Sequence, residues 1–140
     1  MALSQRLLNE AVIAHGHLGP FLVIGLRMGL LGRKLCDTER PRCRVAVIER
    51  KPPLCTVDGI KTALGQSTLQ VRPGPGVCAV FTSMTGKSIA LKVRPSVLER
   101  YWSVAWDKCE EAAVEVLRSS DEDLFEQVSE PHSTSKSSSG

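Results

Sequence analysis

The chain has 140 residues, of which 42% are hydrophobic and 24% charged, a composition typical of one soluble domain with a substantial core. Because only 4% of the residues are aromatic, that core is expected to consist mainly of aliphatic side chains. The net charge of +3 is too small to indicate a nucleic-acid-binding protein, and no apolar segment is long enough to predict a membrane span.

The first residues and the cysteine content both indicate the cytoplasm. Residues 1–17 lack the basic start and long apolar stretch of a secretion signal. The five cysteines, an odd number, are expected to be thiols or metal ligands rather than a disulfide framework. Basic and acidic residues mix over positions 39–51, which favours a solvated strand edge over a phosphate site.

Two helices are predicted at the start of the chain. Apolar residues at helical spacing predict the first over residues 4–14, with Ser4 and Asn9 as candidate caps. The second is expected from Pro20 to about Leu35, and three glycines form a stripe along it: Gly25, Gly29 and Gly32. Each helix glycine costs about 1 kcal/mol relative to alanine. Close packing against a neighbour, such as another subunit, would offset that cost, and the helix is expected to expose an apolar face.

The rest of the chain predicts strands followed by helices. β-branched and alternating runs predict strands over 43–50, 67–71, 76–83 and 87–93, with a short helix over 56–64. Ser96 and Glu99 have capping-box spacing and open a long predicted helix, whose apolar stripe includes Trp102 and Cys109.

A short helix is expected over 121–128, and the Ser-rich residues 130–140 are expected to be a disordered tail. Because the elements do not repeat as β-α-β units, we predict an α+β core domain over 1–129. Its sheet is expected to be small, mixed or antiparallel, and packed with helices.

Two of the three histidines, His15 and His17, flank Gly16 directly before the most apolar segment. Side chains two residues apart in a helix point about 200° apart, so convergence on one ion requires turn or extended backbone, which glycine permits. The following helix start disfavours imidazolium, and neutral imidazole is the form that binds metals. The alternative is a helix cap with two partly buried, hydrogen-bonded histidines.

Cys55 is the best candidate for a third metal ligand. It precedes the helix predicted over 56–64, where the helix dipole favours thiolate. Asp58 either caps the first turn of that helix or orients a ligand histidine. The other four cysteines are expected to be small buried hydrophobic residues: Cys36, Cys43, Cys78 and Cys109.

The segments "HGHLGPFLVIGLRMG" and "CTVDGI" resemble those of the family of the formylmethanofuran dehydrogenase E subunit, over about residues 8–95. The resemblance implies an α+β core that forms intertwined dimers. It also implies that His15, His17 and Cys55 line a metal-binding cavity, with zinc the usual metal, and it places Asp58 in the same motif. Two departures accompany it: the loop after the "CTVDGI" segment is short, and the sequence has no paired C-x-x-C motifs of a carboxy-terminal zinc finger.

Two classes of function remain open. In the first, His15, His17 and Cys55 bind zinc or another divalent transition metal and leave a fourth position free, as in catalytic zinc sites. Lys61 would then attract an anionic substrate. In the second, the protein is a non-catalytic accessory or metal-handling subunit of a molybdenum or tungsten oxidoreductase. The expected partners are a second copy and oxidoreductase subunits, with neither nucleic acid nor membrane among them.

Overall fold

The computed structural model describes residues 4–65 and 69–128 and contains a five-stranded mixed sheet. The strand order is β2-β1-β3-β4-β5, with β1 and β2 parallel and the other neighbours antiparallel. The strands are β1 (Arg42–Val47), β2 (Leu69–Pro73), β3 (Val77–Thr82), β4 (Ser88–Val93) and β5 (Phe125–Val128). The helices are α1 (Gln5–His15), α2 (Pro20–Cys36), α3 (Thr56–Leu64), α4 (Pro95–Trp102), α5 (Cys109–Arg118) and α6 (Asp121–Leu124). The predicted α+β class with a mixed sheet is therefore confirmed.

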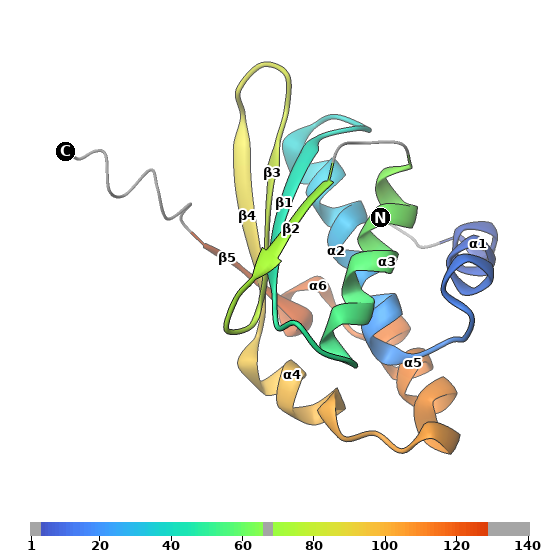
Figure 1. The fold of residues 1–140 in the computed structure, drawn as a ribbon. Helices are drawn as coiled ribbons and strands as arrows, with labels where there is room; N and C mark the ends of the chain where they lie inside the picture. The colour runs from blue at the N-terminus through green and yellow to red at the C-terminus, as the bar shows by residue number, and fades with distance from the viewer. Residues whose placement is uncertain (1–3, 66–68, 129–140) are drawn as a thin grey trace.

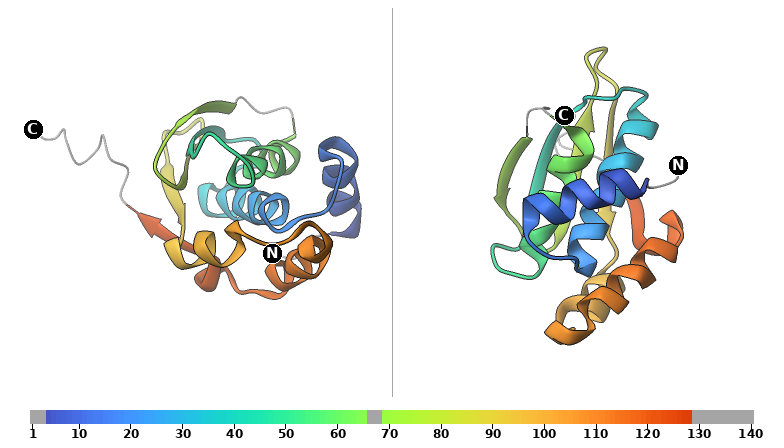
Figure 2. Two further views of the ribbon diagram at one scale, coloured as in Figure 1. Left: turned by 60° about the horizontal axis from the view of Figure 1, so that its bottom comes forward. Right: turned by 90° about the vertical axis from the view of Figure 1, so that its right-hand side faces the viewer.

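The described helices lie on one face of the sheet or at its end (Figures 1 and 2). α2 packs against β3 and β4 with α3 beside it, and α1 packs on the side of this pair away from the sheet. α5 also contacts α2, so α2 has neighbours on every side. Such a helix is expected to be apolar all round, and α2 is buried along nearly its whole length.

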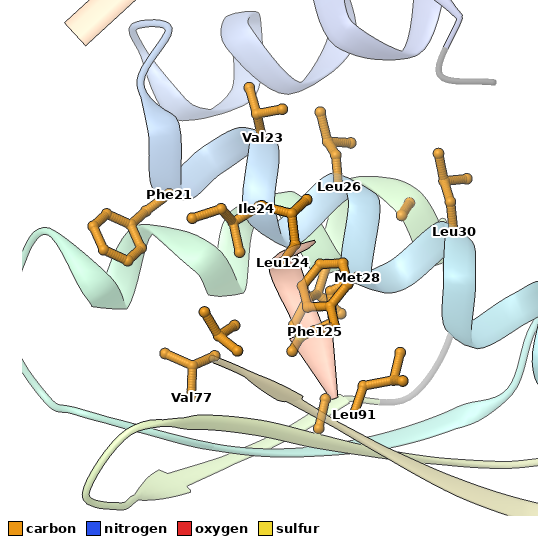
Figure 3. Close-up of a cluster of buried hydrophobic side chains, with 14 of the residues drawn as sticks. Phe21, Val23, Ile24, Leu26, Met28, Leu30, Val77, Leu91, Leu124 and Phe125 are labelled. Atoms are coloured by element: carbon orange, nitrogen blue, oxygen red, sulfur yellow. The ribbon is translucent and has the colours of Figure 1, made fainter. Parts of the chain in front are cut away.

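The core forms where α2 faces the sheet and the carboxy-terminal elements (Figure 3). Its largest contribution comes from α2, and β3, β4 and the α6–β5 junction complete it; labelled members are Phe21, Val23, Ile24, Leu26, Met28, Leu30, Val77, Leu91, Leu124 and Phe125. Burial of this many aliphatic side chains matches the core expected from the composition.

The glycine stripe of α2 packs inside the chain, which corrects the expectation of an exposed apolar face. A Cβ atom on Gly25 would lie 2.1 Å from the Thr56 carbonyl oxygen, and one on Gly59 would lie 2.2 Å from the Leu22 carbonyl oxygen. The two glycines thus let α2 and α3 approach backbone to backbone. Gly29 faces α3 and Gly32 faces Phe81 of β3, so the neighbour lies within the same chain.

The helix predicted from Ser96 onward is wrong in two respects. It begins at Pro95 with Arg94 as its N-cap, and it breaks after Trp102 into separate helices α4 and α5. The break turns the chain back, so that Val116 of α5 is fully buried in the core. Arg27 of α2 donates a hydrogen bond of 2.8 Å to the Val116 carbonyl oxygen and so holds the end of α5.

The helix predicted over 121–128 is also wrong, because only one turn forms. α6 ends at Leu124, and Phe125–Val128 continues as β5, antiparallel to β4. Pairing with the open edge of β4 satisfies backbone groups that a surface helix would not reach. The predicted tail, residues 130–140, lies outside the described residues.

Within 4–65 and 69–128, no helix has both the length and the apolar character needed to cross a bilayer.

Candidate functional site

A pocket of about 360 Å³ opens where the α1–α2 junction meets the segment before α3 and the α4–α5 connection. Its lining brings together residues from three separate stretches of sequence: His15, His17, Gly19, Pro20, Phe21, Leu22, Lys51, Pro52, Cys55, Tyr101, Trp102, Val104, Trp106 and Cys109. The three predicted ligands His15, His17 and Cys55 are therefore all lining residues.

A sharp turn at Gly16 brings the two histidine rings together. His15 is the last residue of α1, and Gly16 follows with φ 110°, a left-handed conformation that favours glycine. The ring centroids of His15 and His17 lie 5.0 Å apart at a steep angle. The expectation that both histidines lie outside a helix is thus corrected for His15, which is the last residue of α1. The change of chain direction between the two histidines occurs at Gly16. His17 does not cap α2, whose N-cap Gly19 has no side-chain hydrogen bond.

Asp58 holds His15 from the first turn of α3. Its Oδ2 lies 2.6 Å from His15 Nδ1, and the histidine side chain is only 9% exposed. When the carboxylate accepts a hydrogen bond from Nδ1–H, the lone pair of His15 is on Nε2. A carboxylate in this position fixes the tautomer and ring orientation of a metal-binding histidine.

His17 has a buried ring nitrogen with no assigned partner. Its Nδ1 forms no hydrogen bond within the described part of the chain. Burial lowers the pKa of His17, and the charges of His15 and Lys51 act in the same direction, so the neutral form is favoured. The indole ring of Trp106 lies against it, with ring centroids 4.6 Å apart. A neutral imidazole with an unsatisfied nitrogen is chemically suited to bind a metal ion.

Cys55 ends the 3₁₀ turn η1 (Pro53–Cys55) and is the N-cap of α3. The side chain is half-buried, and burial raises the pKa of the thiol, although the charge of Lys51 opposes the shift. The expected preference for thiolate at this helix start is therefore corrected: in this structure the thiol is favoured. A bound metal ion would displace the proton, as it does in other thiolate sites.

The structure does not bring these side chains into a formed metal cluster. Among residues 4–65 and 69–128, no group of three or more His, Cys, Asp or Glu side chains is arranged to hold an ion. The donor types nevertheless fit zinc, and the buried Nδ1 of His17 needs a partner.

The structure places the predicted substrate lysine, Lys61, exposed on α3 and outside the pocket lining. Lys51 lines the pocket instead. Cys109 was predicted to be a core residue, yet it faces the same pocket as Cys55. By contrast, Cys36 is buried and donates to the Phe81 carbonyl oxygen, and the apolar surroundings of Cys43 raise its pKa to about 12.

Sequence reasoning missed the aromatic wall of the pocket, although a signal was present. The only tyrosine and both tryptophans of the chain occur within six residues, "YWSVAW", at 101–106. Helical periodicity assigned Trp102 to a core stripe, whereas the break between α4 and α5 turns Trp102 and Trp106 toward the histidines.

The fold and the pocket together define an α+β domain in which two histidines and a cysteine share one cavity. A family model described as "FmdE, Molybdenum formylmethanofuran dehydrogenase operon" matches residues 14–132. The chain belongs to this family, which confirms the resemblance seen in the sequence. The match runs well past residue 95, where the sequence resemblance was expected to end, and so includes α4, α5 and β5. A comparison with curated proteins finds no significant match.

Proposed function

We propose that this chain is a metal-binding protein in which His15, His17 and Cys55 hold a divalent transition metal, with zinc the expected ion. The observation that carries the proposal is the Asp58–His15 pair beside the unsatisfied Nδ1 of His17. Asp58 orients His15 so that its free nitrogen is Nε2. Burial lowers the pKa of His17 and so favours its neutral form. Cys55 supplies the third donor type in the same pocket.

His15, His17 and Cys55 would hold the divalent ion, and the bound ion would supply Lewis acidity toward a carbonyl group or a water molecule. The chain's own contribution is to bind and orient. His15 is held by Asp58, and the ring of His17 is confined between Gly19 and Trp106. Most of the remaining pocket lining is apolar.

Elemental analysis of protein purified without added metal tests the proposal. We expect close to one metal ion per chain in the wild type and in Cys36→Ala, whose thiol lies away from the pocket. We expect most of the bound metal to be lost in His15→Ala, His17→Ala and Cys55→Ala. Full occupancy in all three variants would refute the assignment, and circular dichroism checks that each variant is folded.

A second candidate function is a non-catalytic accessory role. The family description names a formylmethanofuran dehydrogenase operon, which favours a cytoplasmic part in one-carbon metabolism beside that oxidoreductase. Sedimentation of the purified chain mixed with purified dehydrogenase subunits tests this role. Comigration of the chain with one of these subunits supports it, and independent sedimentation at micromolar concentration contradicts it.

We extend the proposal to a homodimer, which the family resemblance implies. The outer face of the described sheet carries half-buried apolar side chains, including Ala46, Cys78 and Val80, and no described helix covers it. Sedimentation of the wild-type chain alone measures its mass in solution. A monomer at micromolar concentration would contradict this part of the proposal.

A further inference from the structure

The aromatic part of the pocket wall, formed by Tyr101, Trp102 and Trp106, is firmly held. The Tyr101 hydroxyl donates to Glu115 Oε1 over 2.7 Å, which ties α4 to α5. The guanidinium carbon of Arg50 lies 5.2 Å from the ring centroid of Trp102, yet Arg50 does not line the pocket. Arg50 therefore supports the Trp102 ring without occupying the cavity.

Trp106 is the feature that the fold itself does not explain. Its side chain is 75% exposed although it lies in η2 (Trp106–Lys108) against the ring of His17. An indole ring at the mouth of a cavity offers a flat apolar surface that a bound molecule would cover. Proline and aliphatic side chains add to the apolar lining, among them Pro20, Leu22 and Pro52.

The permanent charge within the pocket lining is positive. Of the described lining residues, Lys51 alone carries a permanent charge, and no carboxylate lines the pocket. A single lysine at the mouth of an apolar cavity matches a singly charged carboxylate better than a phosphate, for which several donors are usual.

We propose that this pocket binds a small aromatic carboxylate, with its ring against Trp102 and Trp106 and its carboxylate paired with Lys51. The inference rests on the proposed function in using the same pocket, and it names the substrate class of that site. The volume of about 360 Å³ is near the lower end of the range for small-molecule sites, which suits a single ring with a short side chain.

The experiment compares cinnamate with uncharged cinnamamide on chelator-treated, metal-free protein. Both tryptophans of the chain line the pocket, so their two indole N–H signals in a nitrogen-correlated NMR spectrum report directly on it. We expect cinnamate to shift both signals and to bind at least roughly fivefold more tightly than cinnamamide, a preference that requires the lysine charge. Trp106→Leu is expected to weaken the binding of both cinnamate and cinnamamide.

Lys51→Met is expected to remove the preference for cinnamate, whereas Lys61→Met is the matched control and should keep it. Both lysines are exposed, so neither substitution disturbs the core, and the dispersion of the NMR spectrum confirms folding. Equal binding of the two compounds, an unchanged preference in Lys51→Met, or unshifted indole signals at millimolar cinnamate would each overturn the inference. Metal content is measured separately, so a chain that binds cinnamate without ever binding metal would refute the proposed function and leave this inference standing.

Discussion

His15 Nδ1 lies 2.6 Å from Asp58 Oδ2, and this hydrogen bond joins the last residue of α1 to the first turn of α3. The two residues are 43 positions apart in the sequence. The contact gives Asp58 a function other than capping, because its carboxylate turns toward a ring that lines the pocket. A metal site in this pocket would therefore depend on a residue that does not itself line the cavity.

Asp58→Asn is expected to weaken zinc binding about 10- to 100-fold, because the amide still accepts a hydrogen bond but no longer supports the imidazole with a negative charge. Competition with a chromophoric chelator measures the affinity. Asp123→Asn is the control, since Asp123 is an exposed aspartate on α6. Equal affinity in wild type and Asp58→Asn would contradict the role assigned to the pair.

Cobalt substitution is expected to distinguish an open site from a closed one. If His15, His17 and Cys55 are the only protein ligands, cyanide should change the visible spectrum of the cobalt form, because it binds at the fourth position. Cys109→Ser should then retain the thiolate-to-cobalt band. The opposite result would be a cobalt spectrum that cyanide does not change, together with a weaker thiolate-to-cobalt band in Cys109→Ser. That result would show that Cys109, which lines the same pocket, fills the fourth position.

Gly25→Ala is expected to destabilise the fold rather than to change the oligomeric state. The new Cβ would lie 2.1 Å from the Thr56 carbonyl oxygen, so α2 and α3 must separate. We expect the free energy of unfolding to fall by about 3 kcal/mol, measured by urea denaturation. Gly76→Ala is the matched control, because its Cβ would meet Leu98 at an ordinary 3.7 Å. An unchanged midpoint for Gly25→Ala would contradict the close helix crossing.

Arg27→Met is expected to lower the free energy of unfolding by about 2 kcal/mol, because charged hydrogen bonds to the end of α5 are lost. Arg27 donates to the Val116 carbonyl oxygen and pairs with Asp121 at 3.0 Å. Urea denaturation again provides the measurement. Lys34→Met, an exposed change on the same helix, should have little effect. Equal stability of the two variants would argue against this role for Arg27.

The contact between α4 and α5 is expected to weaken in acid. Hydrogen bonds from Arg100 and then Tyr101 hold the pKa of Glu115 below its ordinary value of 4.5. Because the pKa is lower in the folded state, the stabilisation is present above the unfolded value and is lost as the pH falls through the folded value. The difference in Tm between wild type and Glu115→Gln should therefore be largest near neutral pH and shrink below pH 4.5. A difference that does not vary with pH would contradict this linkage.

Local sequence patterns determined much of this fold. Helical spacing predicted α1, the apolar run from Pro20 predicted α2, and β-branched and alternating runs predicted the central strands. Such patterns record which sides of an element are buried. Gly16 between two histidines correctly indicated a turn that brings their rings together. The family resemblance also rested on short local segments, and the family match confirmed it.

Tertiary structure decided where the buried faces lie and what they meet. The glycine stripe of α2 indicated close packing, but only the fold shows that the partner is α3 through Gly59. The helix breaks after Trp102, and the break lets α5 pack against α2. Phe125–Val128 forms a strand because the edge of β4 is open for pairing. Lys51 and Trp106 join the pocket for the same reason: periodicity reports burial along one element, whereas a pocket depends on contacts between elements far apart in the chain.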